Sequence, residues 1–259
     1  MAKVIAFHSS RGGTGKTLIA SNLAFIIAKR GRDVALLDLD FRAPSLATVF
    51  GVDEARKYWM NDLLDGRCRV GEVLVDLTDR YETKGRLLIG PADPRMEAMS
   101  RAARRDRRWQ TRALRRLLAM RDELDDRLGS ELILLDTSPG VEYSSVNAIV
   151  GSDLSILVST MDLLDLEGAQ RMIRDLYRVF ERRVMVLINK AVPHELSSDE
   201  GRRRLLQELA ERFTVPLLAV IPCYCDILLS SRSTLFALDH PNHPFSRALG
   251  EIAKRLEGA

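Results

Sequence analysis

The chain has 259 residues, of which 46% are hydrophobic, and a formal net charge of +3. This length can bury one substantial core and fits one domain over residues 1–259 better than two small domains. This net charge is too small to indicate by itself that the protein binds a polyanion. The chain has three cysteines, which is an odd number and too few for a disulfide framework. Their scarcity favours a reducing, cytoplasmic location.

The apolar residues do not form the runs that secretion or membrane insertion requires. Four apolar residues follow Lys3 before His8, whereas a secretory signal has an apolar stretch of roughly 7–15 residues. No apolar run approaches the ~18–20 residues that span a bilayer. We therefore expect a cytoplasmic protein.

Short apolar runs alternate with longer amphipathic stretches along the chain. Val4–Phe7 predicts a buried strand, a glycine-rich turn follows it, and Leu18–Lys29 has the spacing of a helix that stops at Gly31. Strands that are apolar throughout are expected where both faces of a sheet are covered. Repeated strand–helix units predict an α/β fold with a doubly wound, mostly parallel sheet flanked by helices. The further predicted strands are Val34–Leu39, Leu87–Ile89, Leu132–Leu135, Leu154–Val158, Val184–Ile188 and Leu217–Ile221.

The turn after the first strand, Ser10–Thr17, has the composition of a phosphate-binding loop. Small residues let backbone N–H groups approach phosphates, and the N-terminus of the next helix adds positive potential. In such a loop Lys16 contacts the β- and γ-phosphates, and the hydroxyl of Thr17 binds Mg²⁺. A coincidental glycine-rich turn is the weaker interpretation, because the strand, the helix and the full spacing are all present.

Carboxylates end two of the predicted strands. Asp38 and Asp40 flank Leu39, so that alternation along an extended chain places both on one side. Asp136 follows the apolar strand Leu132–Leu135 and suits a Walker B role, in which it holds Mg²⁺ through water. Hydrolysis of a triphosphate needs a positioned water and a metal anchored by carboxylates. Alternatively, one of these aspartates only caps a turn.

Asn189 and Lys190 follow the predicted strand Val184–Ile188. In GTPases an N-K-x-D motif reads guanine through its final Asp, but this chain has Val192 at that position. The missing carboxylate argues for adenine. Asn189 could instead form only the turn at the end of the strand.

The phosphate loop resembles the deviant Walker A loop of the MinD/ParA family of P-loop ATPases. It has Ser10 where the usual pattern has Gly, and a basic residue before the Gly pair. The family has Lys there and uses it to reach the nucleotide of a partner subunit, whereas this chain has Arg11, which differs from Lys in reach and shape. The resemblance implies ATP and Mg²⁺ as cofactors, with nucleotide contacts from Arg11, Gly12, Gly13, Thr14, Gly15, Lys16, Thr17 and Leu18.

The resemblance extends to the two switch segments and to the base pocket. It implies that Asp40 orients the attacking water and that Asp38 supports the magnesium shell. Asp136 and Gly140 match the family's switch II, which makes Thr17, Asp38 and Asp136 the expected metal site and Lys16, Asp40 and Arg11 the expected catalytic residues. It also implies that Asn189 contacts adenine and that the segment Ile221-Pro222 closes over the base.

The leading hypothesis from this resemblance is an ATP-dependent dimerisation switch that positions an assembly such as division machinery, chromosomes, plasmids or flagella. ATP hydrolysis would be slow until an activating protein partner stimulates it. Residues Arg101–Arg116 contain eight arginines and one aspartate, with six of the arginines at helical spacing. They predict either a cationic stripe that contacts DNA phosphates without sequence preference, or a solvated helix face.

Three features near the C-terminus allow other readings. Cys223 and Cys225 follow a predicted strand, and paired cysteines of metallocentre-assembly relatives make that function an alternative, although buried structural cysteines are simpler. The segment His240–Pro244 is expected to be a rigid loop rather than a metal site. The helix Phe245–Leu256 is expected to pack on the core, and we expect no direct membrane anchor because no further amphipathic helix follows it.

Overall fold

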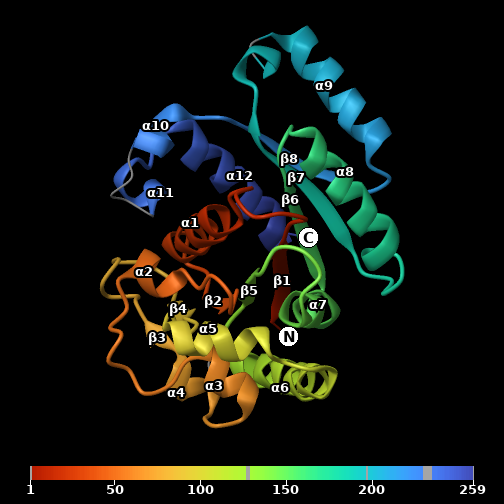
Figure 1. Ribbon diagram of the computed structural model, residues 1–259. Coiled ribbons are helices and arrows are strands. Elements are labelled where there is room, and N and C mark those ends of the chain that lie inside the picture. The colour runs from red at the N-terminus through yellow and green to blue at the C-terminus, as the bar shows by residue number, and fades with distance from the viewer. Residues whose placement is uncertain (1, 127–128, 197, 230–234, 259) are drawn as a thin grey trace.

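One sheet of eight strands forms the centre of the molecule, and helices cover both of its faces (Figure 1). The structure is a computed structural model that describes residues 2–126, 129–196, 198–229 and 235–258. The strand order is β3-β4-β2-β5-β1-β6-β7-β8, and every neighbouring pair is parallel except β3 with β4. The strands are β1 Lys3–His8, β2 Val34–Leu39, β3 Val75–Asp76, β4 Leu87–Gly90, β5 Leu132–Thr137, β6 Leu154–Ser159, β7 Val184–Ala191 and β8 Leu217–Pro222.

This architecture confirms the predicted doubly wound, mostly parallel sheet flanked by helices. Every strand predicted from the sequence is present, and β7 extends furthest beyond its predicted end, to Ala191. The sequence patterns miss β3, because a strand of two residues is too short to carry a hydrophobic period.

The helix that follows the phosphate loop is α1, Lys16–Lys29, and it begins two residues before the predicted start at Leu18. It ends where Gly31 takes a φ of +96°, a left-handed conformation that L side chains rarely adopt. The other helices are α2 Leu46–Phe50, α3 Met60–Asp65, α4 Val70–Val73, α5 Met96–Ala103, α6 Arg107–Asp126, α7 Tyr143–Gly151, α8 Leu163–Met172, a π-helical turn Ile173–Tyr177, a 3-10 turn Pro193–Leu196, α9 Asp199–Arg212, α10 Cys225–Leu229, α11 Phe236–Asp239 and α12 Pro244–Gly258.

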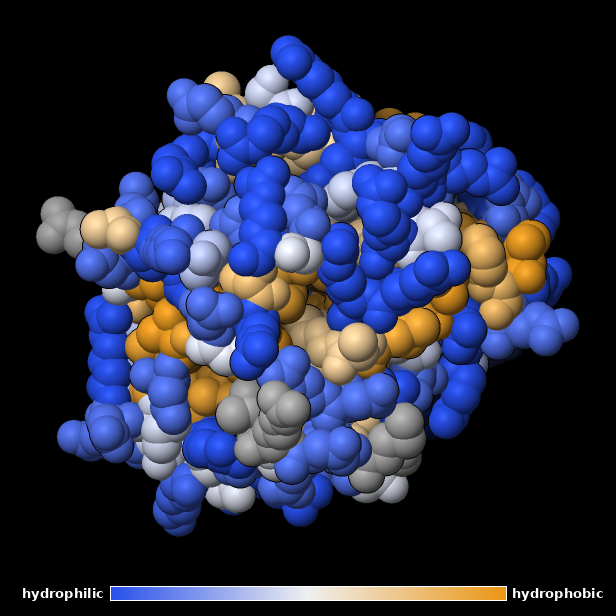
Figure 2. All heavy atoms as spheres, turned by 90° about the horizontal axis from the view of Figure 1, so that it is seen from below, coloured by the Kyte–Doolittle hydropathy of each residue, from blue (hydrophilic) through white to orange (hydrophobic). Residues whose placement is uncertain are grey.

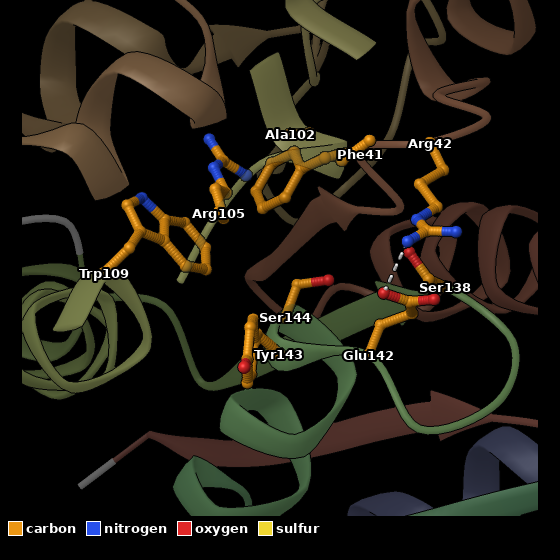
Figure 3. Close-up of a pocket in the computed structure, with 10 residues that line it drawn as sticks. Phe41, Arg42, Ala102, Arg105, Trp109, Ser138, Glu142, Tyr143 and Ser144 are labelled. Atoms are coloured by element: carbon orange, nitrogen blue, oxygen red, sulfur yellow. Dashed lines mark ion pairs between the residues drawn. The ribbon is translucent and has the colours of Figure 1, made fainter. Parts of the chain in front are cut away.

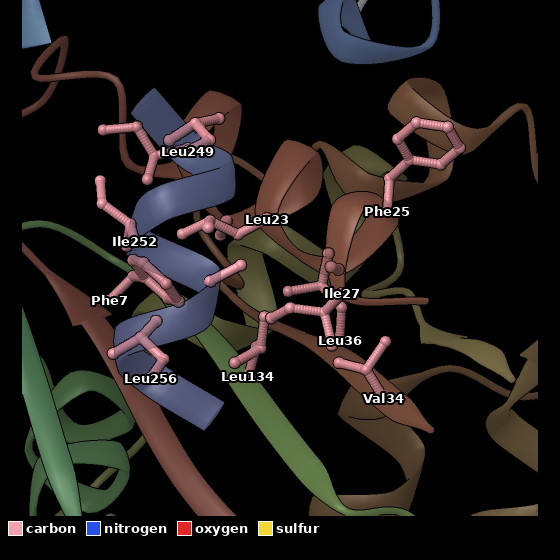
Figure 4. Close-up of a cluster of buried hydrophobic side chains, with 14 of the residues drawn as sticks. Phe7, Leu23, Phe25, Ile27, Val34, Leu36, Leu134, Leu249, Ile252 and Leu256 are labelled. Atoms are coloured by element: carbon pink, nitrogen blue, oxygen red, sulfur yellow. The ribbon is translucent and has the colours of Figure 1, made fainter. Parts of the chain in front are cut away.

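Alternate side chains of each central strand belong to different cores. In β1, Ile5 and Phe7 join a cluster with side chains of α1 and α12, some of which Figure 4 shows. Val4 and Ala6 point to the opposite face and join a cluster with side chains of α3 and α6. Both faces are therefore buried, which explains why the sequence of β1 is apolar throughout.

The carboxyl ends of β1, β2 and β5 meet at one edge of the sheet. In the register of the ladder, Asp38 of β2 lies beside Asp136 of β5, and Phe7 of β1 lies beside Asp136 on its other side. This pairing brings the ends of three strands that are far apart in sequence to the loop that follows β1. The ligand site predicted at this edge therefore has a scaffold of parallel strands.

The prediction of one cationic helical stripe over Arg101–Arg116 is wrong. Helix α5 ends at Ala103 and α6 begins at Arg107, because the carboxylate of Asp106 accepts a hydrogen bond from the backbone N–H of Trp109 and starts a new helix. Hydrophilic side chains nevertheless dominate the face that carries α3 and α6 (Figure 2), and apolar side chains show between them as a broken band.

The C-terminal features divide between confirmed and corrected predictions. Helix α12 packs on the core, as predicted, through five buried apolar side chains: Phe245, Leu249, Ile252, Ala253 and Leu256. The expectation of buried cysteines is wrong, because Cys225 is exposed where α10 begins and Cys223 is only half-buried. Within the described ranges, no three His, Cys, Asp or Glu residues are grouped so that they could hold a metal ion. Among the described helices, none is both long and apolar enough to cross a bilayer.

Candidate functional site

The loop between β1 and α1 is shaped by glycines that no other residue could replace without strain. Gly13 has a φ of +84° and Gly15 a φ of +93°, both in the left-handed region. A Cβ on Gly15 would also lie 2.4 Å from Nδ2 of Asn189. At Gly12 and Gly13, by contrast, an added Cβ would meet no atom within 4 Å. The backbone there borders open space, as a loop that cradles phosphates must.

The first turn of α1 brings a cation and a hydroxyl to this loop. Lys16 is only 7% exposed, and burial lowers the pKa of its ammonium group, although Asp136 and Asp40 act in the opposite direction. The hydroxyl of Thr17 donates a hydrogen bond of 2.6 Å to Oδ2 of Asp136. The structure therefore joins the loop of β1 to the end of β5, as the predicted magnesium site requires.

Asp136 is fully buried. The surroundings of its Oδ1, the oxygen that Thr17 does not contact, indicate whether a cation fits at this site. Burial raises its pKa to about 6, against the opposing effects of the hydrogen bond from Thr17 and the charge of Lys16. Its Oδ1 is also buried and has no hydrogen-bond partner in the described part of the chain. A buried, unpaired carboxylate oxygen is costly, and Mg²⁺ prefers oxygen ligands. The donors present at this site therefore fit a magnesium ion.

Asp38 organises the loop that follows β2, which we call switch I, residues 40–45. One of its oxygens accepts the N–H of Asp40 at 3.0 Å, and the other accepts the N–H groups of Ser45 at 3.0 Å and Leu46 at 3.1 Å. Burial and the neighbouring charge of Asp136 raise the pKa of Asp38. Both oxygens thus have backbone partners, and a contribution of Asp38 to the magnesium shell stays a prediction.

Asp40 joins switch I to switch II, the segment Asp136–Gly140. Its Oδ1 accepts a hydrogen bond of 2.9 Å from the hydroxyl of Ser138 and others from the N–H groups of Arg42 and Ala43. An open cavity of about 510 Å³ lies between the phosphate loop and these two switches. Asp40 faces this cavity together with Gly12, Gly13, Gly15, Lys16, Thr17 and Leu18.

Ser138, Arg42 and Glu142 also line this cavity, and sequence reasoning did not identify them as site residues. The only sequence signal for Ser138 was its place in the switch II motif. Arg42 and Glu142 form an ion pair of 3.1 Å, which Figure 3 shows at the border of a second, smaller cavity. In that cavity Arg105 lies over the rings of Phe41 and Trp109, at 4.5 and 4.0 Å from their centroids.

Arg11 is turned away from the cavity. Its guanidinium lies 3.6 Å from Oδ1 of Asp162 and 3.7 Å from Oδ1 of Asp165, at the start of α8, and its side chain is 53% exposed. The structure thus places Arg11 on the phosphate loop but pairs it with carboxylates of its own chain. A contact between Arg11 and the nucleotide of a partner subunit stays a prediction.

The two residues predicted to contact the base lie at the ends of the neighbouring strands β7 and β8, where Ala191 pairs with Pro222. Asn189 is 4% exposed, and its Nδ2 donates a hydrogen bond of 2.8 Å to the carbonyl of Thr14 in the phosphate loop. Beside it, the ammonium group of Lys190 donates to the carbonyl of Gly13 at 2.7 Å. Pro222 lies at the end of β8 and lines a different groove, of about 530 Å³. Contacts of Asn189 and Pro222 with adenine stay predictions.

Proteins of one family resemble this chain in sequence and in fold. Residues 5–229 match the family described as the CobQ/CobB/MinD/ParA nucleotide binding domain. The septum site-determining protein MinD of Thermotoga maritima is 26% identical over 260 residues, which cover 100% of this chain and 89% of the relative.

Two solved structures have a similar fold. The MinD cell division protein of Aquifex aeolicus has a TM-score of 0.77 and 22% identity, covering 100% of this chain and 98% of that one. MinD of Pyrococcus horikoshii, in complex with Mg-ADP, has a TM-score of 0.74 and 22% identity, covering 99% and 96%. Because the family match spans most of the sequence, this chain belongs to the CobQ/CobB/MinD/ParA family of nucleotide-binding ATPases.

Proposed function

We propose that residues 1–259 form one ATPase domain that binds Mg-ATP, hydrolyses it slowly, and changes between monomer and dimer as it does so. The observation that carries this proposal is the contact between Thr17 and Asp136 at the mouth of the phosphate loop, together with the unpaired buried Oδ1 of Asp136. The complex of the Pyrococcus relative with Mg-ADP supports the same choice of cofactor.

In this proposal the chain supplies positioning and charge, which are the main needs of phosphoryl transfer. Lys16 and the backbone N–H groups of Gly13 and Gly15 hold the phosphates, and Thr17 and Asp136 hold the magnesium ion. When bound, Mg²⁺ neutralises charge on the phosphate oxygens. Asp40 orients the attacking water, since it faces the cavity and is itself held by Ser138.

Exposed apolar side chains near the phosphate loop support a dimer. Val141 is 69% exposed and directly follows switch II, while Leu163 and Leu164 are each 58% exposed at the start of α8. Arg11 contacts carboxylates of this same part of α8. Apolar side chains grouped on a surface commonly mark an interface. The proposed partner is a second copy of the chain, whose nucleotide Arg11 would reach.

The decisive experiment measures molar mass by gel filtration with light scattering, at saturating Mg-ATP and with Mg-ADP. We expect Asp40→Ala to accumulate as dimer with Mg-ATP, because it binds the nucleotide but does not position the attacking water. Lys16→Ala is the matched control that should remain monomeric, because its phosphate contacts are lost. If Asp40→Ala binds Mg-ATP and is still monomeric, the dimerisation switch is wrong.

A second candidate function is ATP-dependent binding to DNA, and the described structure favours it at one place. Five exposed arginines around the junction of α5 and α6 form no ion pair with any described residue: Arg104, Arg107, Arg108, Arg112 and Arg115. Such cations release counterions when they bind phosphates, which makes binding salt-dependent. Neighbouring arginines have structural contacts instead. Arg105 donates a hydrogen bond to the carboxylate of Asp65, and Arg116 donates one to the carbonyl of Leu64.

Binding to random-sequence DNA at several salt concentrations tests this candidate. We expect the double variant Arg108→Glu/Arg112→Glu to weaken binding and to reduce the slope of log K against log salt by about 2, since each phosphate contact contributes roughly 0.9. The matched control is Arg203→Glu/Arg204→Glu on the exposed face of α9. Binding that is insensitive to salt, or that both double variants weaken equally, excludes this surface.

A further inference from the structure

His8 is the last residue of β1 and directly precedes the phosphate loop, and its side chain is fully buried. Both of its ring nitrogens have partners. Nε2 lies 2.8 Å from the carbonyl oxygen of Gly140, and Nδ1 lies 2.9 Å from the hydroxyl of Tyr177. A carbonyl oxygen can only accept a hydrogen bond, so Nε2 carries the proton and donates a hydrogen bond to Gly140. Nδ1 is then unprotonated and accepts a hydrogen bond from the hydroxyl of Tyr177.

Tyr177, whose hydroxyl donates to Nδ1 and so fixes this tautomer, lies in an uncommon type of helix. It is the last residue of the π-helical turn Ile173–Tyr177, which continues α8, and only 1% of it is exposed. Turns of this kind are rare and are frequent at functional sites. Burial raises the pKa of Tyr177, so its hydroxyl remains a donor. Burial also lowers the pKa of His8 to about 4, and the ring is therefore neutral near pH 7.

The hydrogen bond from His8 acts on the backbone of switch II. Gly140 ends this segment with a φ of +74°, and its N–H donates a hydrogen bond of 2.8 Å to the carbonyl of Ser9. Two consecutive residues, His8 and Ser9, thus bond to the carbonyl and to the N–H of Gly140 at the start of the phosphate loop. The same carbonyl also accepts a hydrogen bond of 2.9 Å from the hydroxyl of Ser145. Two residues earlier in switch II, Ser138 donates its hydroxyl to Asp40.

We propose that His8 is a positioning residue for ATP hydrolysis, which holds the Gly140 backbone so that Ser138 and Asp40 keep the geometry that the reaction needs, with Tyr177 fixing the donor nitrogen of its ring. This inference rests on the proposed hydrolysis. His8 touches neither phosphate nor the attacking water in this role. It acts through switch II, and its loss therefore slows turnover more than it weakens nucleotide binding.

The first test compares steady-state hydrolysis by His8→Phe and His8→Gln in the full chain. Phe fills the space without a donor, whereas the amide nitrogen of Gln can reach the position of Nε2. We expect His8→Phe to lower kcat about tenfold with KM for ATP within about twofold, because one buried hydrogen bond is lost. His8→Gln should recover kcat to within about threefold of the original chain.

A purely structural role predicts a different pattern. In that case kcat of the two variants would follow their melting temperatures, and Gln would not rescue turnover. Unchanged kcat in His8→Phe overturns the proposal. So does an equal loss of kcat in both variants when their melting temperatures are also equal.

Tyr177→Phe provides a milder variant that removes one hydroxyl and keeps the buried ring. We expect a fall in kcat of about threefold, because His8 keeps a donor but loses the partner that orients it. The double variant His8→Phe/Tyr177→Phe should be no slower than His8→Phe, since both changes act through one hydrogen bond. Additive losses would contradict the link between the two residues.

Hydrogen exchange of the Gly140 amide separates the failure of this inference from the failure of the proposed function. The amide should exchange faster in His8→Phe than in His8→Gln, whether or not the protein hydrolyses ATP. If the original chain shows no hydrolysis, the proposed function is wrong and exchange still decides whether His8 holds switch II. If exchange in His8→Phe is unchanged, the role of His8 is wrong.

Discussion

The two sides of the candidate nucleotide site differ in how completely they are formed. On the phosphate side, at the ends of β1, β2 and β5, the loop glycines border open space and Thr17 already contacts Asp136. On the base side, at the ends of β7 and β8, the amide of Asn189 is used to support the carbonyl of Thr14, and Pro222 faces a separate groove. The groups predicted to bind phosphate and magnesium therefore lie together, whereas Asn189 bonds to the loop backbone and Pro222 lines another groove.

This difference teaches that the two halves of nucleotide recognition have different physical origins. Phosphates are bound by backbone N–H groups and by a few side chains within one continuous loop, so local sequence specifies the site. A base is bound by side chains from separate strand ends, whose distances depend on how the strands and their loops pack. Four substitutions test the difference, beginning with the one expected to have the largest effect.

Lys16→Ala should have the largest effect on the phosphate side. Lys16 is buried at the cavity and is a cation suited to phosphates, and loss of a hydrogen bond to a charged group should weaken ATP affinity roughly 100-fold. Titration calorimetry with ATP measures this loss. Lys29→Ala, in the last turn of the same helix, is the control and should leave the affinity unchanged. A loss below about threefold would remove Lys16 from the phosphate site.

Asp136→Asn should slow hydrolysis by an order of magnitude or more, because it weakens the magnesium site. The same substitution should also change how the free energy of unfolding depends on pH. The pKa of Asp136 is about 6 in the folded chain, above the value of about 3.9 expected when unfolded. Its contribution to stability is therefore full below about pH 4 and is lost as the pH rises through about 6. Asn does not titrate.

The free energy of unfolding of Asp136→Asn, minus that of the original chain, should therefore increase between about pH 4 and pH 6. Urea unfolding at several pH values measures it. His8 titrates in the opposite sense, since its pKa is lowered to about 4, but it is present in both proteins and its effect cancels. The charge of Asp136 also raises the pKa of Asp38, so that its removal changes the difference in the same direction. A difference that is constant with pH would mean that neither carboxyl has a raised pKa.

Asn189→Ala distinguishes support of the loop from recognition of the base. Its amide holds the carbonyl of Thr14, so we expect ATP, GTP and inorganic triphosphate all to bind about five- to tenfold more weakly, which is the value of one hydrogen bond. Competition binding with these three ligands measures the pattern. A loss confined to ATP would show that Asn189 reads adenine, and the contrast between the two sides would then be smaller.

Pro222→Ala should have the smallest effect. Pro222 lines a groove other than the phosphate cavity, and a surface substitution of this kind changes free energy by less than about 0.5 kcal/mol. We expect the affinities for ATP and inorganic triphosphate to change by less than about threefold. A selective loss of ATP affinity, with triphosphate unaffected, would show that the end of β8 closes over the base.

Much of the fold could be predicted because its signals are local. Strand β2 was predicted at its observed bounds, Val34–Leu39, since a strand covered on both faces has to be apolar throughout. The break between α5 and α6 was not predicted, although Asp106 is a good helix-capping residue. The arginines on either side of it continue a helical spacing, and that spacing does not reveal that Arg105 turns inward against Phe41 and Trp109.

The candidate site divides in the same way. Local sequence predicted that the loop Ser10–Thr17 lies between a strand and a helix and that aspartates lie at two strand ends, and the structure has them there. It could not show that Asp38 bonds to the backbone of switch I, that Arg11 pairs with Asp162 and Asp165, or that His8 reaches Gly140. Those contacts join residues from different segments, and their existence depends on strand register and helix packing rather than on any pattern within one segment.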